Sequence, residues 1–271
     1  MVFMRPRRRM HQKSGAMMRA FQLTGKVAVV TGSSRGIGRS IAEHLAAAGA
    51  RVVISSRKGP ACDEVAQAIR AAGGEAVAVP ANIGDRGQLE NLVAETRRIW
   101  EHIDILVCNA ASNPYYGPMS GLPDDAFSKI LHNNVIANHW LCNLVLPEMA
   151  QRRDGAVIIV SSIGGLKGSG TLGAYGISKA ADMQLARNLA VEWGKHNIRV
   201  NCIAPGLIRT DFARALWENP QLLAQTEAKT PLARIGEPDD IGGVAVFLAS
   251  RAGAFVTGQT LVADGGITIT G

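Results

Sequence analysis

Residues Thr31–Gly38 have the sequence TGSSRGIG and lie between the apolar run KVAVV and the helical pattern RSIAEHLAAAG. A glycine-rich turn that follows a strand and opens a helix lets the backbone approach a pyrophosphate, whose charge is met by the helix N-terminus. Glycines also occur in turns that bind nothing. The function of this turn therefore depends on the fold that the rest of the chain predicts.

The composition indicates a globular protein. The chain has 271 residues, of which 47% are hydrophobic and 19% are charged. No apolar run reaches the roughly 18 residues that a membrane helix needs. The four cysteines and six histidines show no metal-ligand spacing. We therefore expect a cytoplasmic protein with reduced thiols, no metal site and no membrane anchor.

The positive charge is concentrated at the start of the chain. Residues 1–20 contain six cations and no acid, so they account for all but one unit of the formal net charge of +7. The nearly neutral remainder argues against a nucleic-acid partner. The segment has no apolar core of a secretory signal. We expect residues 1–22 to form a basic, disordered N-terminal extension.

Apolar runs rich in β-formers alternate with helical patterns from residue 26 onward. The runs VAVVT, RVVIS, DILVCN and AVIIVSS are continuously apolar, as strands covered on both faces should be. We expect strands at 27–31, 51–56, 76–79, 104–108, 156–161, 198–203 and 259–263. We expect helices near 36–48, 61–72, 86–101, 124–151, 174–195 and 238–249. This alternation predicts a single α/β domain over 23–271, with a doubly wound parallel sheet of about seven strands.

Residues 207–236 are too long for an ordinary connection, and Pro220 and Pro231 interrupt them. Long insertions of this kind are often lids over a binding site. We expect this segment to be a mobile substrate lid. The residues expected to line an apolar substrate pocket, or alternatively to pack on the core, are Tyr115, Tyr116, Met119, Leu216 and Trp217.

The second expected strand indicates which dinucleotide the turn would bind. An NAD site places a carboxylate about 20 residues beyond the first glycine, where it bonds the ribose hydroxyls. The stretch GARVVISSRK from Gly49 to Lys58 has no acid, and Arg57 and Lys58 follow the strand directly. Cations and hydroxyl donors suit a 2′-phosphate, although a solvated turn is the alternative. The pattern favours NADP(H).

A tyrosine and a lysine in SSIGGLKGSGTLGAYGISK suggest the chemistry. Tyr175 and Lys179 are i and i+4, so both side chains leave one face of the expected helix. A free phenol has a pKa of about 10, and a nearby ammonium lowers it toward the range that proton transfer needs. Ser161 and Ser162 close the preceding strand, at the edge where open α/β sheets bind ligands. Such pairs also occur on surface helices, but this position favours catalysis.

Over residues 23–267 the sequence resembles the classical short-chain dehydrogenase/reductase family. The family's Thr-Gly-x-x-x-Gly-x-Gly pattern is met by TGSSRGIG, its Asn-Ala by CNAAS, its Pro-Gly after strand six by APG, and its closing motif by DGG. The resemblance implies a Rossmann-type fold and is nearest to the NADP-dependent carbonyl reductase/retinol dehydrogenase branch. Two departures are Asn82, where the family usually has Asp at the adenine, and the sequence NAA in place of Asn-Ala-Gly.

The resemblance also implies the roles of the site residues. Tyr175 would exchange a proton with the substrate oxygen, Ser162 would hydrogen-bond that oxygen, and Lys179 would lower the tyrosine pKa and bind the nicotinamide ribose. Asn134 would hold a water that connects Lys179 to solvent, although the adjacent Asn133 blurs this match. The expected cofactor-binding residues are Gly32, Ser34, Arg35, Gly36, Ile37, Gly38, Ser56, Arg57, Lys58, Asn82, Ile83, Asn109, Ala110, Ala111, Tyr175, Lys179, Pro205, Gly206, Ile208 and Thr210.

The expected activity is hydride transfer between NADP(H) and a ketone or aldehyde, or a secondary alcohol in the reverse direction. A 3-oxoacyl-carrier-protein reductase is an alternative, although the near-neutral body lacks an obvious basic patch for an acidic carrier. A non-catalytic dinucleotide sensor is another, although such proteins typically lose the tyrosine or the lysine. The expected partners are a small carbonyl or alcohol substrate and, from the resemblance, three further copies of the chain in a homotetramer.

Overall fold

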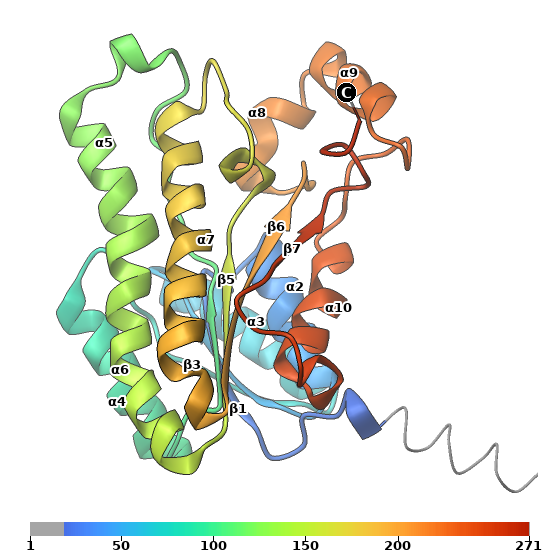
Figure 1. Ribbon diagram of the computed structural model, residues 1–271. Coiled ribbons are helices and arrows are strands. Elements are labelled where there is room, and N and C mark those ends of the chain that lie inside the picture. The colour runs from blue at the N-terminus through green and yellow to red at the C-terminus, as the bar shows by residue number, and fades with distance from the viewer. Residues whose placement is uncertain (1–18, 271) are drawn as a thin grey trace, which may run out of the picture.

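Seven parallel strands form one sheet in the computed structural model, which describes residues 19–270 (Figure 1). Their spatial order is β3-β2-β1-β4-β5-β6-β7, so the order reverses between β1 and β4. That reversal is where doubly wound sheets open a crevice for ligands. The strands are β1 (Val27–Thr31), β2 (Arg51–Ser55), β3 (Glu75–Ala78), β4 (Ile105–Cys108), β5 (Gly155–Val160), β6 (Ile198–Pro205) and β7 (Thr260–Ala263).

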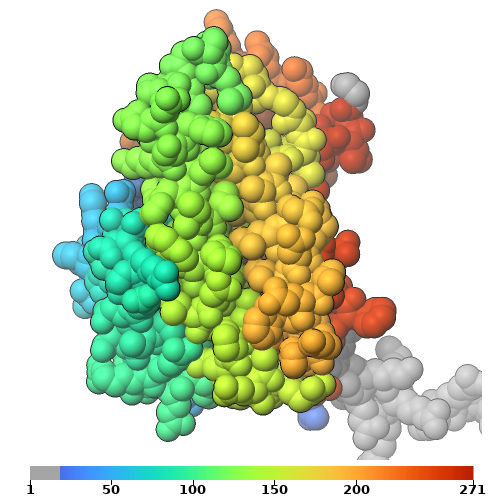
Figure 2. All heavy atoms as spheres, turned by 60° about the vertical axis from the view of Figure 1, so that its left-hand side comes forward, coloured from blue at the N-terminus to red at the C-terminus, as the bar shows by residue number. Residues whose placement is uncertain are grey.

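Helices cover both faces of the sheet. One buried cluster packs α4, α6 and α7 on one face, and a second packs α2, α3 and α10 on the other. Figure 2 shows the outer side of the first layer, where the helices lie next to one another. The helices are α2 (Gly36–Ala47), α3 (Gly59–Ala71), α4 (Arg86–Trp100), α5 (Asp124–Leu131), α6 (Ala137–Arg152), α7 (Gly173–Trp193), α8 (Arg214–Trp217), α9 (Pro220–Lys229) and α10 (Asp239–Ala249).

The two covered faces explain the apolar runs in the sequence. Every residue of β1, β4 and β5 is buried, because alternate side chains enter opposite helical layers. The predicted single-domain parallel fold is therefore confirmed, with strand ends within two residues of those expected. No helix among the described residues has the length and apolarity to cross a membrane. Residues 1–18 of the expected N-terminal extension lie outside the described part of the chain.

The helix expected over 124–151 is confirmed in its extent, but a π turn interrupts its regular geometry. The structure divides it into α5 and α6, joined by a π-helical turn at His132–Ile136. A π turn adds one residue to a helical turn, and it leaves hydrophobic periodicity on either side nearly intact. The sequence pattern therefore gives no sign of it. The turn holds Asn134 fully buried, facing α7.

We expect Gly38→Ala to destabilise the fold by about 1–3 kcal/mol, because overpacking in a fixed environment forces backbone shifts. A Cβ on Gly38 would overlap Asn109 Nδ2, after β4, and the carbonyl oxygen of Gly32, in the turn after β1; a hydrogen bond holds these two atoms together. Urea unfolding measures the change. Gly243→Ala in α10 is the matched control: a Cβ there meets nothing within 4 Å, so this variant should gain about 0.5–1 kcal/mol. Equal stabilities for the two variants would contradict the close packing.

Candidate active site

The glycine-rich turn lies between the C-terminal end of β1 and the N-terminus of α2. Gly32 and Gly36 have φ of +66° and +55°, a region that favours glycine. The helix N-cap, Arg35, makes no side-chain capping bond, so the first backbone N–H groups of α2 are not capped by a side chain. Such a helix end attracts a phosphate. The local structure thus fits the pyrophosphate site that the sequence predicts.

Asn109 and Thr31 connect this turn to the end of β4. Asn109 Nδ2 donates to the carbonyl oxygens of Thr31 (2.9 Å) and Gly32 (3.2 Å). Thr31 Oγ1 accepts from the backbone N–H groups of Asn109 (3.1 Å) and Ala110 (3.2 Å). Ala110 and Ala111 are half-buried. They follow the end of β4, which these hydrogen bonds hold beside the turn. The Asn-Ala motif therefore links the ends of β1 and β4, the two strands between which the crevice opens.

The two serines of the turn have different roles. Ser33 is fully buried; its hydroxyl donates to the carbonyl of Val30 (2.7 Å) and accepts from the N–H of Ser55 (2.9 Å). It therefore fixes β1 against β2 and is not placed to bind a cofactor. Ser34 is half-buried at the same turn, beside the exposed Arg35. Ser34 and Arg35 thus remain available as phosphate donors.

The ends of β2 and β3 form the adenosine side of the crevice. Arg57 and Lys58 are exposed after β2, and neither forms an ion pair within residues 19–270. Ser56 Oγ lies 3.1 Å from Cys62 Sγ. Asn82 and Ile83 are half-buried after β3, and Asn82 Oδ1 accepts from the N–H of Gly84 (3.2 Å). Two unpaired cations at this position are what a 2′-phosphate would neutralise.

The end of β6 brings the lid segment to the glycine-rich turn. Pro205 is buried, and a Cβ on Gly206 would lie 2.8 Å from Asp264 Cα. Ile208 is buried. Thr210 packs against the turn, because a Cβ added at Gly36 would lie 3.1 Å from Thr210 Cγ2. Arg35 Nη1 also pairs with Asp211 Oδ2 at 3.2 Å. These contacts place the Pro-Gly-x-Ile-x-Thr segment next to the N-terminus of α2.

Tyr175 and Ser162 face each other across Gly164. A Cβ on Gly164 would lie 3.4 Å from Ser162 Oγ and 3.8 Å from two ring carbons of Tyr175. Ser162 Oγ accepts from the Gly164 N–H (3.0 Å), which leaves its own hydrogen free to be donated. Ser161 is buried, and its hydroxyl donates to the Lys179 carbonyl (2.7 Å). Of the two serines, only Ser162 is available to a substrate.

Lys179 is buried between α7 and β5. Its Nζ donates to the carbonyl of Val160 (2.9 Å) and to Asp182 Oδ2 (2.9 Å), and lies 5.7 Å from the centroid of the Tyr175 ring. Burial lowers the pKa of Lys179, but the carboxylate of Asp182, followed by Tyr175, outweighs it and raises the pKa above the ordinary value. The lysine therefore remains charged beside the phenol.

Asn134 joins the loop after β4 to α7. Its Oδ1 accepts from the N–H of Ser112 (2.8 Å), and its Nδ2 donates to the Ser112 carbonyl (3.1 Å) and to Ser178 Oγ (3.0 Å). Asn133 instead donates to Ser112 Oγ (3.0 Å) and is only half-buried. Asn134 is thus the asparagine that contacts the catalytic helix.

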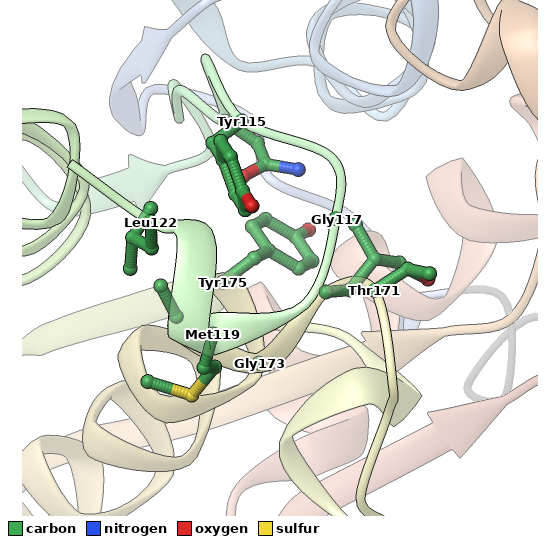
Figure 3. Close-up of a pocket in the computed structure, with 10 residues that line it drawn as sticks. Tyr115, Gly117, Met119, Leu122, Thr171, Gly173 and Tyr175 are labelled. Carbon is green, nitrogen blue, oxygen red and sulfur yellow. The ribbon is translucent and has the colours of Figure 1, made fainter.

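A pocket too narrow to hold a water molecule in this structure lies beside Tyr175 (Figure 3). Tyr115 and Met119 line it, as the sequence suggests, but Tyr116, Leu216 and Trp217 do not. Trp217 Nε1 donates to the Thr210 carbonyl (2.8 Å). Phe212, in the same long segment after β6, has its ring centroid 6.1 Å from that of Tyr175. The lining residues are Asn113, Tyr115, Gly117, Met119, Leu122, Thr171, Leu172, Gly173, Ala174 and Tyr175.

The sequence analysis missed Asn113, Thr171, Phe212, Asn138 and Asp182. Asn113 and Thr171 lie on loops and Phe212 lies in a short 3-10 helix, where no long periodicity places a side chain. Asp182 did carry a signal, because it is three residues after Lys179 and so shares its helix face. No group of three or more acidic, cysteine or histidine side chains suited to a metal occurs among residues 19–270.

The proteins that this chain resembles in sequence are described as reductases or dehydrogenases. A family profile described as "Enoyl-(Acyl carrier protein) reductase" matches residues 32–268. "Dehydrogenase/reductase SDR family member 4" of Bos taurus is 41% identical over 253 residues, which cover 93% of this chain and 91% of the relative. The human protein of that name is 40% identical with the same coverage.

Solved structures share the fold. A gluconate 5-dehydrogenase from Burkholderia cenocepacia J2315, in complex with NADP and tartrate, superposes with a TM-score of 0.90 at 31% identity, covering 94% of this chain and 100% of that one. A 7α-hydroxysteroid dehydrogenase, complexed with NADH and 7-oxo glycochenodeoxycholic acid, has a TM-score of 0.88 at 35% identity, covering 92% and 96%. With the glycine-rich turn, the Tyr-Lys pair and the sheet order, these matches place the chain in the classical short-chain dehydrogenase/reductase family.

Proposed function

We propose that the chain is an NADP(H)-dependent oxidoreductase that interconverts a ketone or aldehyde and the corresponding alcohol. The observation that carries this proposal is the buried Lys179 ammonium next to Tyr175, with Ser162 across Gly164. A phenol beside a cation can exchange a proton with an alcohol oxygen near neutral pH. The proposed reaction therefore needs no group beyond these side chains and the nicotinamide.

In the reducing direction, Tyr175 donates its phenolic proton to the carbonyl oxygen of the substrate. Ser162 donates its free hydrogen to that same oxygen, because its lone pair already accepts from Gly164. Two donors aimed at one oxygen stabilise the negative charge that develops on it. The bound nicotinamide supplies the hydride in this direction. In oxidation Tyr175 takes the proton from the alcohol.

The crevice supports NADP(H) over NAD(H). The uncapped start of α2 would hold the pyrophosphate, and Arg57 and Lys58 would meet the 2′-phosphate. Relatives of the same fold differ in this choice, since one neighbour is in complex with NADP and another with NADH. The exposed Arg57 and Lys58 after β2 are the reason for proposing NADP(H) for this chain. Pro205, Gly206, Ile208 and Thr210 would face the nicotinamide.

The pocket favours neutral carbonyl substrates. None of its ten lining residues is charged, so a substrate carboxylate would lose its water without gaining an ion pair. A panel of aldehydes, ketones, diketones, 3-oxoacyl thioesters and oxo-acids, assayed by NADPH consumption, tests the proposal. Turnover of neutral ketones or aldehydes is expected. Preference for a 3-oxoacyl thioester would indicate the carrier-protein alternative, and turnover of no compound would refute the proposal.

We also propose that the protein is cytoplasmic and assembles into a homotetramer. Exposed apolar side chains on neighbouring elements support self-association. Ile177 and Val191 are exposed on α7, and Ile136 is exposed at the π turn before α6. Contact with further copies of the chain would cover these exposed side chains.

We expect the parent to use NADPH with a higher kcat/KM than NADH. Arg57→Asp should lower kcat/KM for NADPH by about tenfold to a hundredfold, because a carboxylate repels the 2′-phosphate and replaces a charge-assisted bond. It should also raise kcat/KM for NADH. Arg251→Asp, an exposed arginine after α10, is the matched control and should change neither value. A parent that prefers NADH would contradict the NADP(H) assignment.

Tyr175→Phe should lower kcat by about 10²–10⁴-fold, because it removes the proton donor and keeps the ring. NADPH affinity, measured by fluorescence titration, should stay near that of the parent. Tyr116→Phe provides the control, since Tyr116 is exposed and does not line the pocket. Activity of Tyr175→Phe within tenfold of the parent would show that another group transfers the proton.

Residues 207–236 should behave as a substrate lid. Their base contacts the turn before α2, and α8 and α9 lie above the C-terminal ends of the strands (Figure 1). Short helices separated by Glu218 and Asn219 can pivot as units when a ligand enters. Hydrogen exchange with NADPH and a ketone analogue should show the largest gain in protection here. Equal protection with and without the ligands would show a fixed wall.

A further inference from the structure

Asp182 is a buried carboxylate to which the proposed mechanism assigns no role. Its side chain has no exposed surface, and that of its partner Lys179 is 2% exposed. In residues 19–270 this is the only ion pair in which both side chains are buried to that degree. A buried ion pair has a large desolvation cost and is weak evidence for stability alone. Its position next to the catalytic tyrosine suggests a function.

Each carboxylate oxygen of Asp182 has its own donor. Oδ2 accepts from Lys179 Nζ (2.9 Å), and Oδ1 accepts from Asn138 Nδ2 (3.0 Å). Asn138 Nδ2 also donates to the carbonyl oxygen of Asn134 (2.6 Å) at the π turn. The carboxylate is thus fixed between its own helix, α7, and the facing helix, α6. It cannot turn away from the lysine without losing both bonds.

The lysine is oriented by the same contacts. An ammonium group has three donors, and Lys179 uses one for the Val160 carbonyl and one for Asp182. The third hydrogen bonds to neither of these acceptors. The centroid of the Tyr175 ring lies 5.7 Å from Nζ. Asp182 and Val160 therefore fix where the ammonium group lies relative to the phenol.

The carboxylate also decides whether the lysine is charged. Burial by itself lowers the pKa of Lys179, and Asp182 makes the largest opposing contribution. A buried lysine without a partner loses its proton at a much lower pH. If Lys179 lost its proton, Tyr175 would lose the cation that favours its phenolate. The buried pair is therefore placed to set the charge next to Tyr175 from outside the pocket.

The other titratable groups around Asp182 are thiols, on three elements. Cys202 Sγ on β6 donates to the Asp182 carbonyl at 3.5 Å, and Cys108 on β4 and Cys142 on α6 lie nearby. Burial, then the Asp182 charge, raises the pKa of Cys202 to about 12. A side-chain hydrogen bond with Cys142, followed by burial, raises the pKa of the Cys108 thiol well above its ordinary value.

These two thiols therefore stay neutral over the working pH range. Burial also raises the pKa of Asp182, against the opposing effects of Lys179 and Asn138. Arg187, one more turn along α7, adds a weaker positive field at Cys202.

We propose that Asp182, held in place by Asn138, is a positioning residue that keeps the Lys179 ammonium group charged and aimed toward Tyr175. This proposal rests on the proposed function, because it assigns Asp182 to the proton-transfer machinery of the same site. Asp182 touches neither the pocket nor the turn before α2, so it acts only through Lys179.

The test is a direct titration of the phenol. The chain has three tyrosines, so tyrosine labelled with carbon-13 at the ring carbon bearing the hydroxyl gives three signals, and Tyr175→Phe identifies that of Tyr175. In Asp182→Asn the Tyr175 signal should titrate at a pH higher than in the parent by about one unit or more. Asn138→Ala should shift the titration of the Tyr175 signal in the same direction by a smaller amount. If Asp182→Asn does not fold, Asn138→Ala is the variant that tests the proposal.

Asp104→Asn is the matched control. Asp104 is also a buried carboxylate in ion pairs, but it precedes β4 at the opposite end of the sheet and contacts Lys26, His102 and Arg152. It should change the unfolding midpoint and leave the Tyr175 titration unchanged. An unchanged or lower titration pH in both Asp182→Asn and Asn138→Ala would overturn the proposal, because Asp182 would then be only a structural residue.

Kinetics separate this proposal from the proposed function. In the oxidising direction, the acidic limb of the kcat profile should move to higher pH in Asp182→Asn, whereas loss of folded protein would lower kcat equally at every pH. If the parent turned over no carbonyl or alcohol, the proposed function would fail. The NMR titration would still decide whether Asp182 controls Tyr175.

Discussion

The structure of the site depends on keeping one ammonium group charged inside the protein. Lys179 lies between α7 and β5 with almost no exposed surface, where an unpaired cation would be very unfavourable. The Val160 carbonyl and the Asp182 carboxylate satisfy two of its donors. Asp182 in turn requires Asn138, and Asn138 uses a carbonyl at the π turn. The irregular helix geometry between α5 and α6 is thus linked to the charge state of a residue on α7.

A second set of contacts joins the two ends of the crevice. Thr210 lies against the position where a Cβ of Gly36 would be, and Asp211 pairs with Arg35. Both charged side chains of that pair are largely exposed, so the pair adds little stability. Its consequence is geometric: the first residues after β6 touch the turn that would hold the pyrophosphate. If residues 207–236 act as the proposed lid, movement of their base and occupation of that turn are expected to affect each other.

The sequence was sufficient for the features that depend on pattern. Apolar runs identified the strands because both sheet faces are covered, and the spacing of Tyr175 and Lys179 placed both side chains on one helix face. It was insufficient where a single hydrogen bond decides the outcome. Trp217 was expected to line the pocket or to pack on the core; it does not line the pocket, and its indole N–H bonds the Thr210 carbonyl. The π turn at Asn134 was not visible, because helical periodicity continues on both sides of it.

The pocket separates proton transfer from substrate selection. The charges that would govern Tyr175 lie behind it, in the buried pair on α7, whereas the pocket in front of it has no charged lining residue. Under the proposed function, we expect substrate selection to depend on shape. Met119 is the adaptable part of that shape: a Cβ on Gly173 would approach its Cγ and Sδ to 2.5 Å, so the thioether fills the space that the glycine leaves. Methionine side chains repack easily. A flexible wall opposite a fixed proton donor would admit carbonyl compounds of several shapes while the reacting oxygen stays in one place.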